Sequence, residues 1–216
     1  MQFSEGESEM YDSRSTSDFY DAYGEWEWNR LETSAYGRLQ ALIHRDFLER
    51  YLRSGWVVLD AGGGPGRFSL AMAEIGANVT LLDISKGQLR IARQKMASGS
   101  QMNRLSGLVS GDVATLPFRD RSFDAVVCYG GPLSYVCEQR FQALRELVRV
   151  TKQGGIILAS VMSRLWASAN AGRRPFLPDW HQLWRVIETG DQPPVPSSKA
   201  PIMHPAMHLY TSMGTG

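Results

Sequence analysis

Hydrophobic and polar positions along the middle of the chain alternate between two periods. Short runs rich in β-branched residues, such as "WVVLDA" and "NVTLLDI", are each followed by a segment whose apolar side chains recur every three or four residues. The first pattern is typical of strands and the second of amphipathic helices. Because strands joined by helices lie parallel, the order predicts an α/β fold, a doubly wound, mostly parallel, Rossmann-like sheet with helices on both faces.

The same pattern gives the expected elements. Strands are predicted at 56–61, 78–84, 107–112, 122–130 and 154–161, and helices between them at 67–76, 85–97 and 138–151. Upstream of them, residues 34–51 have apolar positions at helical spacing, which predicts an amphipathic helix that leads into the core. These positions are Leu39, Leu42, Ile43, Phe47 and Leu48.

The two ends of the chain differ from the middle in amino-acid composition. Residues 1–17 are rich in Ser, Glu and Asp, which predicts a flexible acidic arm. Seven prolines interrupt the chain after Val161, and only "DWHQLWRVIE" (179–188) is expected to be helical there. We therefore divide the chain into the arm, one folded domain at 18–162 that begins with an aromatic, helical lid, and an irregular extension of that domain at 163–216.

The composition restricts the cellular compartment and the kinds of binding partner that we expect. The 216 residues carry a formal net charge of +1, so no global field favours binding to nucleic acid. Two cysteines, Cys128 and Cys137, are too few for a disulfide framework and lack the spacing of a metal site. No apolar run reaches the length of a membrane span, and the acidic start does not resemble a signal peptide. These features predict a cytoplasmic protein without a metal or a membrane partner.

The stretch "LDAGGGPGRF" (59–68) follows the first predicted strand and is the main candidate for chemistry. Glycines there let the backbone turn sharply and approach a ligand, and the helix that follows points its free N–H groups at the same place. The dinucleotide pattern G-x-G-x-x-G fails because Arg67 stands where the third glycine is required. A phosphate loop fails because no Gly-Lys-Ser or Gly-Lys-Thr follows. What fits is an acidic residue before alternate glycines: Asp60, Gly62, Gly64 and Gly66.

This spacing resembles motif I of the class I S-adenosylmethionine-dependent methyltransferases, in particular the small-molecule type. The resemblance runs from about Trp56 to Ser160, and four elements match in order. Asp83 ends the second strand, where the family has an acidic residue that accepts hydrogen bonds from both ribose hydroxyls. "GDVATLPFRDRSFDAVV" resembles the family stretch whose acidic residue, here Asp112, lies beside the adenine. "CYGGPLSYV" and "LVRVTKQGGIILAS" match the family's fourth strand end and its last helix and strand.

The resemblance implies S-adenosylmethionine as cofactor and a set of residues around it. The expected cofactor-binding residues are Asp60, Ala61, Gly62, Gly63, Gly64, Gly66, Asp83, Ile84, Gln88, Asp112, Val113, Ala114, Cys128, Tyr129 and Gly130. Structural roles stay open for some of them. Asp60 and Asp112 are also suited to capping turns, and Cys128 to filling the core as a small apolar group.

Candidates for the chemical step are weaker. Positioning of the acceptor is expected to be the protein's main contribution, so a general base is optional. Tyr135, Tyr20, His204 and His208 are the available candidates. The aromatic residues of the lid, Tyr20, Tyr23, Trp26 and Trp28, are expected either to cover the cofactor and acceptor or to pack within an amino-terminal helix.

The chain departs from the family pattern after its fifth strand, because no sixth and seventh strands are evident beyond Val161. An exposed edge strand favours association, so a homodimer is predicted. Two functions follow. One is methyl transfer to a small-molecule acceptor, and the other is a catalytically degenerate cofactor-binding domain that acts as a partner or regulatory module.

Overall fold

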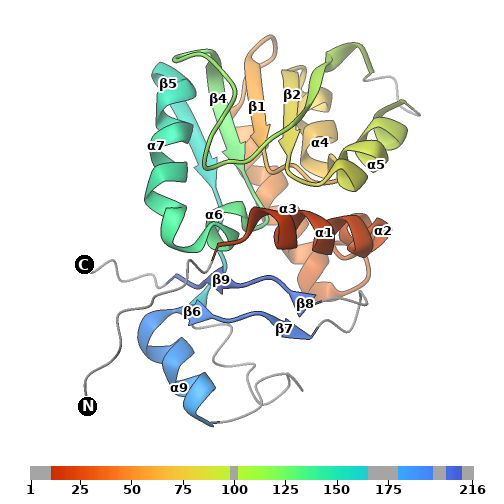
Figure 1. Ribbon diagram of the computed structural model, residues 1–216. Helices are drawn as coiled ribbons and strands as arrows, with labels where there is room; N and C mark the ends of the chain where they lie inside the picture. The colour runs from red at the N-terminus through yellow and green to blue at the C-terminus, as the bar shows by residue number, and fades with distance from the viewer. Residues whose placement is uncertain (1–10, 98–101, 165–179, 197–202, 211–216) are drawn as a thin grey trace.

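A five-stranded parallel sheet forms the centre of the computed structural model, which describes residues 11–97, 102–164, 180–196 and 203–210 (Figure 1). The strand order is β3-β2-β1-β4-β5. The strands are β1 (Val57–Ala61), β2 (Asn78–Asp83), β3 (Leu105–Ser110), β4 (Phe123–Cys128) and β5 (Thr151–Ala159). The predicted α/β fold is confirmed. Chain order reverses between β1 and β4, and open α/β sheets bind ligands at such a switch point, beyond the carboxyl ends of the strands.

Helices cover both faces because the strands are apolar on both sides. α3 (Ala35–Tyr51), α4 (Arg67–Ile75) and α5 (Lys86–Ala97) contribute to one core cluster, and α6 (Pro132–Tyr135) and α7 (Arg140–Val150) contribute to the other. Successive strand residues alternate between the two clusters. Val58 and Val127 belong to the first, and Leu59 and Val126 to the second. This period of two fixes the sheet between its helical layers.

The amino-terminal residues within the described range do not form a flexible arm. α1 (Ser13–Tyr23) begins after Asp12, whose carboxylate accepts hydrogen bonds from the N–H groups of Arg14 and Ser15. The N–H of Tyr11 donates to the carboxylate of Glu138 at 3.1 Å. The expectation of a mobile segment is therefore wrong for residues 11–17, because polar residues at a helix start serve as caps. Residues 1–10 of the predicted arm lie outside the described residues.

α1 and α2 (Glu25–Asn29) cross the carboxyl ends of the strands (Figure 1). Polar contacts join α1 to the start of α5. Asp21 accepts a hydrogen bond from the N–H of Gly87 at 2.7 Å, and the side-chain amide of Gln88 donates to the carbonyls of Tyr20 and Gly24 at 2.8 and 3.0 Å. The helical pair thus forms a fixed roof over this end of the sheet.

The amphipathic helix predicted at 34–51 exists as α3, but its apolar positions are oriented differently. Leu48 is fully buried, whereas Leu39, Leu42, Ile43 and Phe47 are all exposed. Only Leu48 of the five apolar positions thus meets the core. Helical spacing identifies a common face, but it does not say whether the core or the solvent covers that face.

The extension beyond β5 is not irregular throughout. α9 (Trp180–Thr189) confirms the predicted helix, and two short antiparallel pairs follow it. β6 (Asp191–Gln192) pairs with β9 (Met207–His208), and β7 (Val195–Pro196) pairs with β8 (Met203–His204). In the described part of the chain these strands pair only with one another and do not extend the five-stranded sheet. They dock beneath it, where Met207 and Leu209 pack against Tyr135.

Candidate functional site

The loop between β1 and α4 is shaped by glycines that no other residue can replace. Gly62 has φ +77°, and a Cβ built on it would lie 2.3 Å from the Cγ of Pro132. A Cβ on Gly63 would lie 2.6 Å from the carboxyl group of Asp60. Gly64 differs, because the nearest atom to its added Cβ is the Cγ of Glu27 at 3.8 Å. The space above Gly64 is therefore open and forms part of a pocket.

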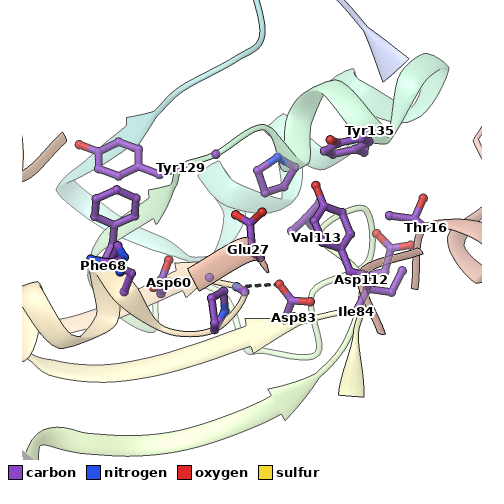
Figure 2. Close-up of a pocket in the computed structure, with 18 of the residues that line it drawn as sticks. Thr16, Glu27, Asp60, Phe68, Asp83, Ile84, Asp112, Val113, Tyr129 and Tyr135 are labelled. Atoms are coloured by element: carbon purple, nitrogen blue, oxygen red, sulfur yellow. Dashed lines mark hydrogen bonds between the residues drawn. The ribbon is translucent and has the colours of Figure 1, made fainter. Parts of the chain in front are cut away.

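This pocket lies between the carboxyl ends of the strands and the roof, and encloses about 850 Å³ including its mouth. Of the predicted cofactor-binding residues, ten line it: Asp60, Gly62, Gly63, Gly64, Asp83, Ile84, Asp112, Val113, Tyr129 and Gly130. Figure 2 shows Asp83 beside the glycine loop in the middle of the pocket, with Ile84, Asp112 and Val113 gathered at one end. One wall thus carries the loop and three acidic residues from successive strand ends.

Asp83 holds the middle of this wall together. Its carboxylate accepts hydrogen bonds from the N–H groups of Gly64 and Ser85, both at 2.8 Å. Burial raises the pKa of Asp83 to about 6, and the two backbone N–H bonds oppose that rise. The group is therefore mostly ionised at neutral pH. Each carboxylate oxygen keeps a further lone pair, so a ligand can still donate to it.

Asp112 stands at the end of the pocket and contacts the start of the chain. One carboxylate oxygen accepts from the N–H of Ala114 at 2.8 Å, and the other accepts from the hydroxyl of Tyr11 at 2.5 Å. Asp112 thus caps its own turn, and it also lines the pocket. The two roles left open by the sequence coexist in one side chain.

Asp60 lies behind the glycine loop and is almost fully buried. Its carboxyl group accepts a hydrogen bond from the hydroxyl of Ser69 at 2.5 Å. Burial raises the pKa of Asp60 to about 7, and the charge of Asp83 adds to that effect. Asp60 therefore changes its protonation state near neutral pH.

The roof contributes a charged pair directly above the loop. Glu27 and Arg30 form an ion pair at 2.6 Å, with side chains 15% and 30% exposed. Glu27 faces Gly64, and a guanidinium nitrogen of Arg30 lies 3.3 Å from the Cβ position of Gly130. Burial raises the pKa of Glu27, while Arg30 and Arg67 oppose that rise. An ion pair thus spans the end of the pocket away from Asp112.

Two tyrosines close the pocket between the sheet and the carboxy-terminal extension. The rings of Tyr20 and Tyr135 lie 5.6 Å apart at 88°, and their hydroxyls are hydrogen-bonded to each other. Burial raises the pKa of both phenols well above the ordinary value. Both therefore remain protonated at neutral pH and are donors rather than bases.

The other expected site residues lie outside the pocket lining. Ala61, Ala114 and Cys128 are core residues, and Gly66 packs against Leu81 and Ala92. Gln88 is fully buried and holds the roof instead of facing the pocket. Burial raises the pKa of the Cys128 thiol to about 12. Cys128 therefore matches the core role left open by the sequence.

Among the predicted lid aromatics and catalytic candidates whose side chains the structure describes, only Tyr20 and Tyr135 line the pocket. Trp28 packs outside it, with the guanidinium of Arg67 4.3 Å from its ring centre. His208 bonds to Asp191 at 2.6 Å, away from the pocket lining. His204 lies on strand β8 and not on a helix, so the two histidines do not form the helical pair that binds metal.

Sequence reasoning missed most of the roof. The missed lining residues are Tyr11, Thr16, Glu27, Arg30, Leu31, Pro65, Arg67, Phe68, Gly111, Pro132 and Val136. The available signal was the Glu27 and Arg30 pair, three residues apart in a segment otherwise rich in aromatic residues. Within the residues that the structure describes, no cluster of three potential metal ligands occurs, and no helix is long and apolar enough to cross a bilayer.

The buried carboxyl of Asp60 predicts a pH dependence of stability. Its folded pKa of about 7 lies above the ordinary value of 3.8 for an aspartate, so the folded protein binds more protons than the unfolded chain between these pH values. Stability should therefore fall as pH rises through this window. In Asp60→Asn this loss disappears. The free energy of unfolding, measured with urea from pH 4 to 8, should rise relative to wild type by up to a few kcal/mol.

Asp124→Asn is the matched control. The pKa of Asp124 is lowered by Lys152 and by the N–H of Val57, so removing this carboxylate should cost stability at pH 7 and cost less as pH falls. If Asp60→Asn and wild type keep parallel profiles from pH 4 to 8, Asp60 is not the buried acid described.

The sequence of the chain is similar to those of several known proteins. A family model described as "Methyltransferase domain" matches residues 58–155. The chain is 32% identical over 184 residues to malonyl-[acyl-carrier protein] O-methyltransferase of Pectobacterium atrosepticum. The aligned residues cover 81% of this chain and 62% of that protein. It is 37% identical over 168 residues to a protein of Encephalitozoon cuniculi assigned to the methyltransferases, with 77% and 69% covered.

A solved S-adenosylmethionine-dependent methyltransferase from Methanosarcina mazei has the same fold, with a TM-score of 0.59 at 24% identity and 76% and 77% of the two chains covered. The chain spans about half to two thirds of the length of the first curated relatives. The matched segment contains the glycine loop, Asp83 and Asp112. The chain belongs to the class I S-adenosylmethionine-dependent methyltransferases.

Proposed function

We propose that this chain binds S-adenosylmethionine beneath α1 and α2 and transfers its methyl group to a small-molecule acceptor. The observation that carries the proposal is the single wall formed by the open glycine loop, Asp83 and Asp112. A cofactor with an adenosine and a charged amino-acid tail requires such a wall, because hydroxyl and amino donors along its length need acceptors at matching intervals. The sulfonium group supplies an already activated methyl when bound.

The adenosine half is proposed to lie along Asp83 and Asp112. The ribose hydroxyls donate to the free lone pairs of Asp83, which is mostly ionised at neutral pH. The base lies between Ile84 and Val113, and its amino group faces the carboxylate of Asp112. Tyr11 already donates to that carboxylate, so its phenol is proposed to cover the outer edge of the base.

The amino-acid tail is proposed to lie between the glycine loop and the ion pair of the roof. The tail carries one positive and one negative group, and so does the pair of Glu27 and Arg30. Glu27 faces Gly64 and Arg30 faces Gly130. Glu27 and Arg30 already pair with each other, and the remaining carboxylate oxygen and guanidinium N–H groups can make charge-assisted hydrogen bonds to the two ends of a zwitterion.

The acceptor is proposed to enter beside Tyr20 and Tyr135. Aromatic and apolar side chains also line other parts of the pocket, among them Leu31, Phe68 and Tyr129. A mostly apolar, covered pocket with a few polar groups suits a small organic molecule better than a nucleic acid. One of the two phenols donates to the other, so the remaining O–H can orient an acceptor oxygen by donating to it, and positioning is then the main source of rate. The Pectobacterium relative is named for a malonyl group, so acids belong in any acceptor panel.

Asp83 provides the first test of cofactor binding. Asp83→Ala removes the acceptor for both ribose hydroxyls. Its affinity for S-adenosylhomocysteine, measured by calorimetric titration, should fall roughly tenfold to a hundredfold. Asp18→Ala, on the exposed side of α1, should bind as wild type does. The melting temperature of each variant reports whether it folds. Unchanged affinity in a folded Asp83→Ala protein would contradict the ribose assignment.

The ion pair of the roof provides the second test. The double variant Glu27→Gln with Arg30→Gln removes both charges together, which avoids leaving one charge buried alone. It should bind S-adenosylhomocysteine about tenfold or more weakly, because two charge-assisted contacts are lost. Binding of 5′-methylthioadenosine, which lacks the tail, should not change. Equal weakening of both ligands would place the tail elsewhere.

Turnover tests the reaction itself. With methyl-labelled S-adenosylmethionine, transfer of label to members of a panel of small phenols, amines and carboxylic acids should be detected for wild type and be reduced in Asp83→Ala. If the wild-type chain binds the cofactor and the panel yields no labelled product, the binding-module alternative is the better description.

A further inference from the structure

Apolar side chains are exposed on α3 and α7, two helices that cover opposite faces of the sheet. On α3 they are Leu39, Ile43, Phe47 and Tyr51, and on α7 they are Phe141, Leu144 and Val148, with exposed fractions between 37% and 63%. Single exposed apolar residues are ordinary on protein surfaces, but contiguous groups of them mark interaction sites. The position of these two groups relative to β5 decides what they can bind.

The exposed apolar side chains of α3 face the side of the molecule at which the sheet ends with β5. His44 packs on Tyr129 beyond the end of β4, Leu48 belongs to the core cluster on this face, and Arg45 forms an ion pair at 3.0 Å with Glu74 of α4. Arg45 therefore marks the side of α3 that faces α4, which packs on β2, toward the middle of the sheet. At roughly 100° per residue, the apolar group lies about 120–160° around the helix from Arg45. It faces the opposite side, where the sheet ends.

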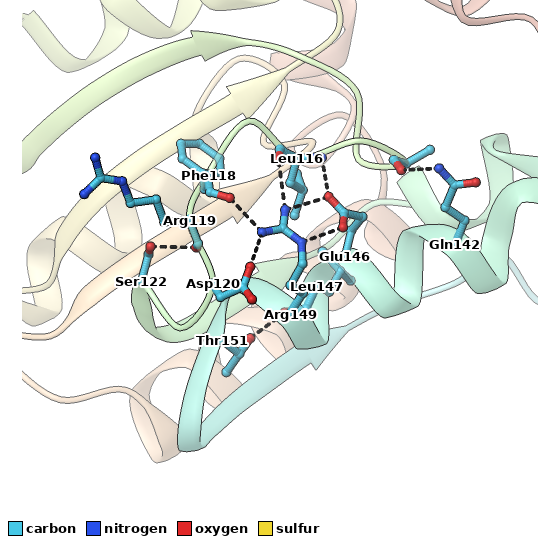
Figure 3. Close-up of polar contacts among 11 residues, drawn as sticks. Leu116, Phe118, Arg119, Asp120, Ser122, Gln142, Glu146, Leu147, Arg149 and Thr151 are labelled. Atoms are coloured by element: carbon cyan, nitrogen blue, oxygen red, sulfur yellow. Dashed lines mark hydrogen bonds and ion pairs between the residues drawn. The ribbon is translucent and has the colours of Figure 1, made fainter.

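The α7 group points the same way on the other face. Arg149 donates to the carbonyls of Leu116 and Phe118 and binds Asp120 and Glu146 (Figure 3). Gln142 donates to the carbonyl of Ala114. These contacts hold the side of α7 that faces the loop from β3 to β4, which crosses the inner part of the sheet. Phe141, Leu144 and Val148 lie about 80–160° around the helix from Arg149 and Gln142, away from that loop and toward the β5 side.

Between the two groups lies the edge of the sheet. β5 pairs with β4 on its inner side, and in the described residues no strand pairs with its outer side. The outward N–H and C=O groups of such an edge are a template for another strand. This unpaired edge has exposed apolar side chains on both faces of the sheet. A strand that pairs with it therefore has to carry apolar helices on both of its own faces.

We propose that this edge, defined by β5 with the apolar groups of α3 and α7, binds a second copy of the chain. A two-fold axis perpendicular to the sheet pairs β5 with the β5 of the other copy in antiparallel register. The same axis brings α3 to α3 on one face and α7 to α7 on the other. Each layer of the surface then meets an identical layer, so one contact satisfies the strand edge and both apolar groups.

Area supports a second copy as the occupant. Seven half-exposed apolar side chains offer on the order of 600 Å² before the strand edge is counted, near the roughly 800 Å² per partner of a standard interface. Two ion pairs near the edge lie within one copy: Asp46 binds Arg50 at 2.9 Å, and Lys152 binds Asp124 at 2.6 Å. Arg145 is exposed on α7 beside Phe141 and Val148, and its long side chain can extend to solvent at the rim of a symmetric contact.

Sedimentation of the full chain at several concentrations tests the proposal. Wild type should show a monomer and dimer in equilibrium. Phe47→Glu and Val148→Glu, one on each face, should each raise the dimer dissociation constant at least tenfold. Arg93→Gln makes the same change of −1 in net charge on the exposed side of α5 and should leave the dimer unchanged. Because both variants alter exposed side chains, their affinity for S-adenosylhomocysteine should equal that of wild type.

Hydrogen exchange locates the contact. Amides of β5 should exchange faster when wild type is diluted below its dissociation constant, while amides of the inner strand β1 should not change. A wild-type monomer at all concentrations overturns the proposal. So does a dimer that both glutamate variants leave intact, or one that forms without protecting β5.

Discussion

The hydrogen bond from the N–H of Gly64 to the carboxylate of Asp83 is the interaction on which the pocket depends. It joins the loop after β1 to the end of β2, the two strand ends that meet at the switch point of the sheet. The bond needs a backbone that approaches closely, which the glycines allow, and an acid that stays ionised although it is buried. The same carboxylate also fixes the start of α5 through Ser85.

The roof relies on this same turn. Asp21 of α1 accepts hydrogen bonds from the backbone of Gly87 and from the hydroxyl of Ser85, and Gln88 holds the carbonyls at the end of α1. Wall and roof are thus anchored to one short stretch between β2 and α5. A substitution in this stretch therefore alters both the wall and the roof of the pocket. The buried Gln88 follows the proposed ribose-binding residue Asp83 closely in sequence because both hold the same part of the pocket.

The parts of the site that could be predicted from the sequence are those where function follows from local pattern. Asp83 ends an apolar run, and the run must be a buried parallel strand, so its carboxylate had to lie at the carboxyl edge of the sheet. The pair of Glu27 and Arg30 could not be placed in this way. Five helical residues in an aromatic segment fit many positions, and only packing against the loop brings Glu27 over Gly64.

The sequence by itself determined the α/β alternation, the glycine loop and the acids at the strand ends, because each depends on periodicity or on backbone freedom within a few residues. The tertiary structure alone decided which apolar faces are covered. α3 and α7 have helical patterns that predict an apolar face, yet on α3 only Leu48 of the five apolar positions is buried. Periodicity records that side chains share a face, and burial depends on what lies opposite it, which is a property of the whole fold.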